Sequence, residues 1–247
     1  PETTFLILGV TFQFDSNTTT KTASDLESLI TTTITNYNTD SLKDFNRPFR
    51  HSQLTGLIDD TDNSILSNVT TVTLAKFVTP VTTTETAYTL NFENAFFHPH
   101  DGHVSIIAST GFSIDNSSLE YFLDDDGNGN IRIFYLVAGV RTYYDTLAGT
   151  VDYTSGIIRI NNVKITSVSD VDEVASTRFR VTVIPDSNDV IPVRNQLLEI
   201  DLSNTTVGGT IDPTATTGKG YTVTTSGTTT TTTVATTSSV TSTTSGY

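Results

Sequence analysis

The segment Asp44–Leu74 constrains the fold more than any other part of the sequence, because the signals of a short helix, a turn and a strand follow one another within it. Pro48 fixes its own φ and disfavours helix at the residue before it, so a helix can begin only beyond it. Ser52 can cap that helix. Its apolar face is formed by Leu54, Leu57 and Ile58. A cluster of Asp, Asn and Ser then predicts a turn, and the β-branched, Thr-rich sequence beyond it predicts a strand.

The residues before this segment predict a strand and a longer helix. Phe5–Phe14 is apolar at first and alternates later, as a half-buried strand does. Ser24 and Glu27 have the spacing of a capping box, which opens a helix. The apolar face of this helix is formed by Leu26, Leu29, Ile30, Ile34 and Tyr37. Residues 1–80 are therefore predicted to form an α/β domain with the order strand, helix, helix, strand.

Residues 81–205 change character, since strand patterns are interrupted by Gly, Asn and Asp at short intervals. Strands are expected at residues 88–92, 103–108, 131–137, 142–145, 156–160, 163–168, 179–184 and 196–202. This spacing predicts a larger, antiparallel, β-rich domain. The chain as a whole is expected to be of the α+β class.

Residues 206–247 form a low-complexity tail that is rich in Thr and Ser. Such a tail is too polar to bury a core of its own. We expect it to be extended and ordered by partners, either by adding strands to a neighbouring sheet or by wrapping around its surface. A tail with little support of its own is the alternative.

Composition excludes several classes of partner. The formal charge is −14, with 13 basic against 27 acidic side chains, which argues against a nucleic-acid surface. No apolar run approaches the roughly 20 residues of a membrane span, and no signal peptide is visible. The absence of Cys excludes disulfides and thiolate metal sites. Because the sequence has no Met and begins with Pro, we expect it to be a piece of a longer protein.

The stretch 124–130 matches half of a calcium-binding loop. Asp124, Asp126 and Asn128 supply oxygens at positions 1, 3 and 5 of that motif. The bidentate Glu required at position 12 is replaced by Tyr135. A Gly- and Asn-rich hairpin turn explains the same residues, because Gly and Asn accept positive φ. We predict the turn and keep the three oxygen ligands as a metal alternative.

A histidine-rich stretch gives a second metal alternative. In an extended segment His98 and His100 would point to the same side and could grip Zn²⁺ or Fe²⁺. A third ligand would have to come from Asp101 or His103 by a tight reversal of the chain. The Pro and Gly residues of this stretch predict a polar loop instead.

We predict no catalytic residue, no cofactor and no small-molecule substrate. The sequence contains no nucleophile elbow, zinc-protease helix motif or phosphate-binding Gly-rich loop. Carboxylate pairs such as Asp59/Asp60 and Asp170/Asp172 are expected by chance among 27 acidic residues. A hydrolase with paired carboxylates would need them to face each other across a cleft, which a sequence does not reveal.

Several longer blocks carry a family resemblance. In chain order they are YNTDSLKDFN, FRHSQLTGLIDDTDNSILSN, DDDGNGNIRIFY, GTVDYTSGIIRI and PDSNDVIPVRNQLLEID. These blocks resemble the C-terminal portion of the baseplate wedge subunit of contractile-tailed, T4-like phages, in the baseplate-J-like family. The likeness covers about residues 5–205 and fades in the Thr-rich tail.

The resemblance implies a structural virion protein of the tail baseplate, assembled in the host cytoplasm. It implies that copies pair, that neighbouring wedges are joined into a ring around the tail hub, and that contacts shift when the sheath contracts. Other wedge and hub proteins would be the partners. A calcium-dependent, adhesin-like module on a cell surface is the alternative, since it explains the acidity, the Thr content and the half calcium motif.

Overall fold

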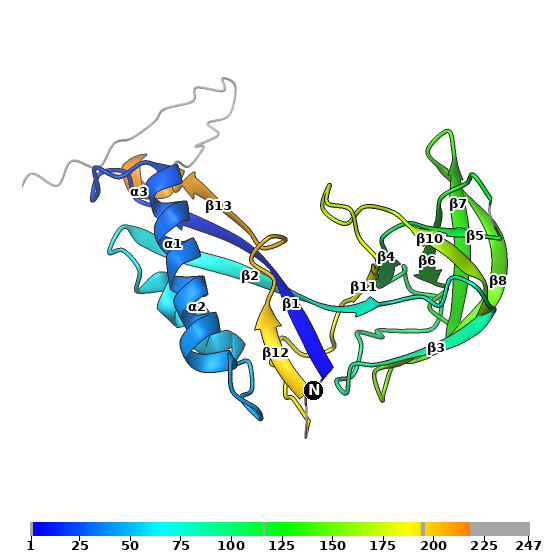
Figure 1. Ribbon diagram of the computed structural model, residues 1–247. Helices are drawn as coiled ribbons and strands as arrows, with labels where there is room; N and C mark the ends of the chain where they lie inside the picture. The colour runs from blue at the N-terminus through cyan, green and yellow to red at the C-terminus, as the bar shows by residue number, and fades with distance from the viewer. Residues whose placement is uncertain (1, 116, 194–195, 218–247) are drawn as a thin grey trace, which may run out of the picture.

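The computed structural model describes residues 2–115, 117–193 and 196–217, and Figure 1 shows two sheets with helices beside only one of them. The first sheet has the strand order β12-β1-β2-β11-β4, with β13 also paired to β1. The second has the order β10-β5-β6-β7-β8-β9-β3. None of the described helices is long and apolar enough to cross a membrane. The α+β class is confirmed.

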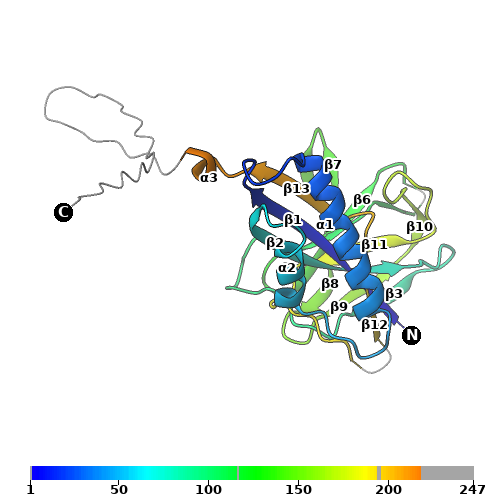
Figure 2. The same ribbon diagram turned by 90° about the vertical axis from the view of Figure 1, so that its left-hand side faces the viewer.

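The predicted strand–helix–helix–strand unit is present. Its elements are β1 (Glu2–Phe14), α1 (Ala23–Tyr37), the π-helix η1 (Asn38–Leu42), α2 (His51–Asp59) and β2 (Ile65–Val78). Alternate residues of β1 are buried, as its apolar pattern predicts. Helices α1 and α2 lie against one face of the first sheet (Figure 2). The predicted helix faces are buried except at Leu29 and Leu57, which are exposed.

Both helix starts differ from the prediction. The capping box of α1 is formed by Thr22 and Asp25 rather than by Ser24 and Glu27, so the helix begins two residues earlier than the predicted box would place it. Helix α2 begins at His51 without a local side-chain cap. Its first N–H donates to Asp189 Oδ1 at 2.9 Å instead, from a loop far along the chain. Ser52 is therefore not the cap.

The second sheet is antiparallel throughout. Its strands are β3 (Thr86–Asn91), β5 (Phe112–Ile114), β6 (Tyr121–Asp125), β7 (Asn130–Val137), β8 (Val140–Asp152), β9 (Ile157–Val163) and β10 (Ile165–Val168). Strands β5 and β6 were not predicted. The expected strand at 103–108 is reduced to β4 (Ile107–Ser109), which belongs to the first sheet.

The first sheet is completed by segments that come late in the chain. Strand β11 (Phe179–Val183) pairs with the end of β2, opposite residues 74–78. Strands β12 (Gln196–Ile200) and β13 (Thr206–Ile211) return to lie parallel to β1. The division into domains at residues 80 and 205 stays a prediction. Residues 206–217 of the expected tail form β13 and the short helix α3 (Pro213–Thr217), whereas residues 218–247 lie outside the described residues.

Asp125, at the end of β6, joins the two sheets. Its carboxylate is fully buried, and Oδ1 accepts hydrogen bonds from the backbone N–H groups of Ile106 and Ile107 at 2.8 and 3.0 Å. Ser105 Oγ donates to the same oxygen, and Tyr153 Oη donates to Oδ2. Because residues 105–107 lead into β4 of the first sheet, one side chain fixes that segment to the second sheet.

Candidate assembly surfaces

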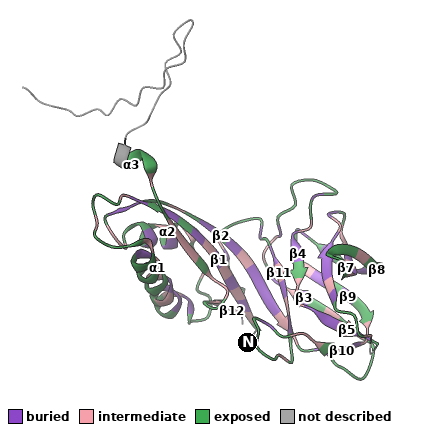
Figure 3. Cartoon of the chain, turned by 90° about the horizontal axis from the view of Figure 1, so that it is seen from above, coloured by how far each residue is buried: buried purple, intermediate pink, exposed green. Residues whose placement is uncertain are grey.

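The hairpin of β7 and β8 presents apolar side chains on both of its faces. Its turn, Ala138-Gly139, has positive φ at both residues, as a two-residue hairpin turn requires. Beyond the core, Figure 3 shows much of β8 as exposed. The exposed apolar and aromatic residues are Leu136, Val137, Val140, Tyr143, Tyr144 and Leu147. We call residues 136–147 the β7–β8 arm; exposed apolar side chains that gather on one element mark an interaction site more often than scattered ones do.

A cluster of charged and aromatic side chains lies at the base of this arm. Asp124 is 1% exposed, and it accepts hydrogen bonds from Arg132 Nε at 2.8 Å and Arg141 Nη1 at 2.7 Å. The guanidinium of Arg132 lies 4.5 Å from the Tyr143 ring, and that of Arg141 lies 4.7 Å from the Phe134 ring. We call these five residues the Asp124 cluster. It holds the two arginines against one buried ring, Phe134, and one exposed ring, Tyr143.

The electrostatics of the cluster favour a charged Arg132. Burial disfavours a charged Arg132, but the hydrogen bond and charge of Asp124 outweigh it and raise the pKa of that guanidinium. Tyr143 Oη donates a further hydrogen bond to Asp124 Oδ2 at 3.2 Å. The carboxylate thus accepts hydrogen bonds from two arginines and one tyrosine.

The structure does not bring the predicted calcium ligands together. Asp124 contacts the two arginines, whereas Asp126 accepts hydrogen bonds from Asn128 N at 2.8 Å and from Asn130 N at 3.0 Å within the turn. The predicted hairpin turn between β6 and β7 is confirmed. Gly127 is required there, since its φ is +72° and an added Cβ would lie 2.5 Å from the His103 amide nitrogen.

The histidine-rich stretch is a loop packed around Tyr153. The His98 ring stacks on Tyr153 with 4.3 Å between centroids, and its Nε2 lies 3.3 Å from Asp101 Oδ1. His100 Nδ1 contacts the backbone carbonyl of Asp101 instead, so the two predicted ligands have different partners. His103 is buried, which the sequence did not indicate. Within the described ranges, no three His, Asp or Glu side chains are placed to hold a metal ion.

Comparison with known proteins shows that the strand–helix–helix–strand unit is similar to one protein family. Residues 2–77 match the family model described as baseplate structural protein gp6, C-terminal domain III. The matched residues run from the start of β1 almost to the end of β2. A search of curated proteins gave no match. The predicted resemblance to baseplate wedge subunits is therefore confirmed over these residues, and the chain carries a gp6-like domain of the phage baseplate structural proteins.

Proposed function

We propose that this protein is a wedge component that joins neighbouring wedges into a ring around the tail hub of a phage baseplate. The observation that carries the proposal is the gp6-like domain at residues 2–77, whose family is described as structural. The protein would act in the virion tail, with other wedge and hub proteins as partners. Its work would be to hold contacts rather than to transform a substrate.

The β7–β8 arm and the Asp124 cluster are the surfaces we propose for contact between paired copies. Tyr, Phe and Arg are enriched where interfaces draw most of their binding free energy. Asp124 already holds Arg132 and Arg141 in place, so less side-chain freedom is lost when a partner binds. Val140 would add apolar area beside the hairpin turn, and Leu147 would add it further along β8.

We further propose that contacts at the arm are exchanged when the sheath contracts. The backbone hydrogen bonds of this hairpin are made between β7 and β8 of the same chain. The hairpin can therefore dissociate from one partner and bind another without unfolding. The hydrogen bonds from the Ile106 and Ile107 amides to Asp125 would meanwhile keep the two sheets together.

The test compares two substitutions with equal exposure. Leu147 on the arm and Val69 on β2 are each 65% exposed, so Leu147→Ser and Val69→Ser remove similar apolar area from the two different sheets. We expect Leu147→Ser to weaken self-association in light scattering about tenfold, and Val69→Ser to leave it unchanged. Cryo-electron microscopy of the particle should show the fold repeating in a ring. A monomer that joins no particle and is stabilised by millimolar Ca²⁺ would reject the proposal in favour of the adhesin-like alternative.

A further inference from the structure

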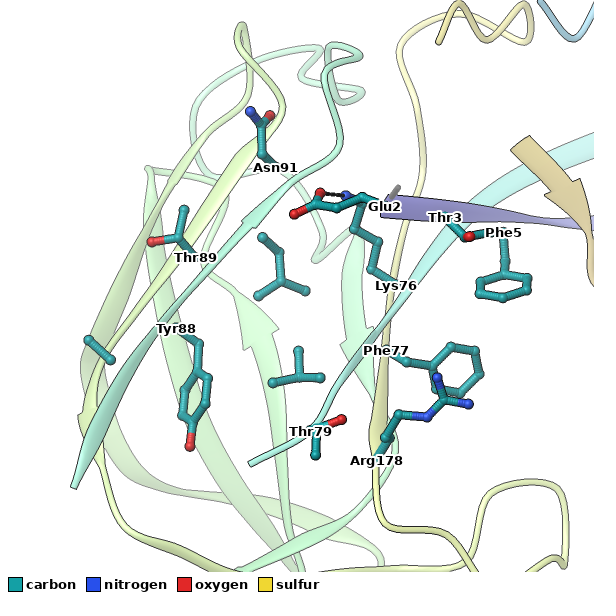
Figure 4. Close-up of a pocket in the computed structure, with 13 residues that line it drawn as sticks. Glu2, Thr3, Phe5, Lys76, Phe77, Thr79, Tyr88, Thr89, Asn91 and Arg178 are labelled. Atoms are coloured by element: carbon teal, nitrogen blue, oxygen red, sulfur yellow. Dashed lines mark hydrogen bonds and ion pairs between the residues drawn. The ribbon is translucent and has the colours of Figure 1, made fainter. Parts of the chain in front are cut away.

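A cleft opens where β1 and β2 separate. The two strands pair from Phe14↔Ile65 to Phe5↔Ala75, and the residues of β1 before Phe5 pair only with β12, on its opposite edge, among the described strands. Between this fork and β3 lies a cleft of about 540 Å³, which we call the β2–β3 cleft (Figure 4). That volume is within the range of sites that bind ligands. On one side it is lined by residues 76–78 at the end of β2 and by Thr79, which follows the strand.

The strand on the other side of the cleft has a free edge. β3 is the last strand of the second sheet and, among the described strands, pairs only with β9. Phe92 N donates to Gly156 O at 2.9 Å, next to the pair Asn91↔Ile157. Since alternate residues bond to the partner in an antiparallel ladder, the backbone groups of Thr89 and Asn91 point away from β9. All of residues 87–91 line the cleft, so it follows the edge of the strand rather than one face.

The cleft is cationic in an acidic chain. The Lys76 side chain is 8% exposed, and its Nζ lies 2.7 Å from Glu2 Oε2, which projects into solvent. The Arg178 guanidinium lies 4.8 Å from the Phe77 ring and has no ion pair with any carboxylate among the described residues. Two cations thus face one carboxylate, whereas the whole chain has a formal charge of −14. Stacking on an aromatic ring positions a guanidinium and leaves its N–H donors free.

We propose that the β2–β3 cleft binds an extended acidic segment of another protein. The segment would add to the free edge of β3 through the backbone groups of Thr89 and Asn91, and a carboxylate side chain would pair with Arg178. Lys76 would share its charge between that carboxylate and Glu2. The chain's own residues 218–247 are a poorer occupant, because they contain Thr and Ser but no acidic residue. The cleft and the β7–β8 arm involve different elements, so either proposal can fail alone.

The first experiment measures binding of a defined peptide by NMR. The capped peptide Thr-Val-Asp-Val-Glu and its uncharged counterpart Thr-Val-Asn-Val-Gln are titrated into the full chain. We expect the acidic peptide to shift the amide resonances of Thr89 and Asn91 and to bind at least tenfold more tightly than the uncharged one. Binding should weaken with added salt.

Two substitutions separate charge from strand addition. Arg178→Gln should weaken binding of the acidic peptide about tenfold, whereas Arg47→Gln makes the same charge change at an exposed site that does not line the cleft and should have no effect. Thr89→Pro removes an outward N–H without touching the ladder to β9, and it should abolish binding of both peptides.

Four results would overturn the proposal, and three of them concern the two peptides and the Arg178 variant. They are equal affinity for the two peptides, an Arg178→Gln variant that binds as the unchanged chain does, and shifts confined to residues outside the cleft. A peptide with the sequence of residues 228–237 that shifts Thr89 and Asn91 would also overturn it, since the occupant would then be the Thr-rich tail.

Discussion

Replacing Asp125 should release the two sheets from each other. In Asp125→Ala the N–H groups of Ile106 and Ile107 lose their acceptor inside the protein, where backbone groups cannot turn toward water. A buried donor without a partner costs about 1–3 kcal/mol, so the two together cost about 2–6 kcal/mol. The hydroxyls of Ser105 and Tyr153 can reorient toward other acceptors, so we add no free-energy cost for them. Because a whole domain is stable by about 5–15 kcal/mol, this one carboxylate supplies a large part of the total.

The assay is equilibrium unfolding in urea together with hydrogen exchange. Asp125→Ala should lower the free energy of unfolding by about 2–6 kcal/mol and should speed exchange at the Ile106 and Ile107 amides. Asp125→Asn is the matched control, since its carbonyl oxygen can still accept from both amides and the loss should stay near 1 kcal/mol. Equal losses for the two variants, or a loss below about 1 kcal/mol for Asp125→Ala, would refute the reasoning.

Three further changes test other parts of the structure. Asp124→Ala leaves the cluster arginines without a carboxylate, so urea unfolding should show a loss of about 1–3 kcal/mol, reduced by the exposure of Arg141, and light scattering should show weaker self-association. Thr22→Ala should cost about 1 kcal/mol in thermal unfolding, whereas Ser24→Ala should cost almost nothing, because Thr22 is the cap. Hydrogen bonds from Lys21 and Ser64 lower the pKa of Asp62 to about 2 from 3.8; the folded value is below the unfolded one, so this stability is present above pH 4 and lost between pH 4 and 2. Asp62→Asn should flatten that part of the acid unfolding curve.

Patterns among neighbouring residues were sufficient to predict the strand–helix–helix–strand unit. The alternation of Phe5–Phe14 and the spacing of apolar residues in the two helices each depend on a few neighbouring residues, and the structure confirms the elements they predict. The hairpin turn after β6 was predictable for the same reason, because Gly127 and Gly129 supply the positive φ that the turn requires.

Long-range partners explain what the sequence did not reveal. The N-cap of α2 comes from Asp189, which no local pattern connects to His51. Strand β6 contains two adjacent Asp residues, which are rare in strands, so propensity argued against it. The parallel return of β12 and β13 to β1, and the β2–β3 cleft, arise only once the whole chain is paired.

The two adjacent aspartates of β6 give one strand a role in stability and, in the assembly proposed above, a second role at the contact between copies. Successive side chains of a strand point to opposite faces, so Asp124 and Asp125 are held by different sets of donors. Asp125 accepts hydrogen bonds from neutral donors within the chain and is fully buried, so a partner cannot contact it. Asp124 is satisfied by Arg132 and Arg141, and Arg141 is half-exposed. A neighbouring subunit can therefore compete for that arginine and rearrange the outer face while the joint between the sheets stays intact.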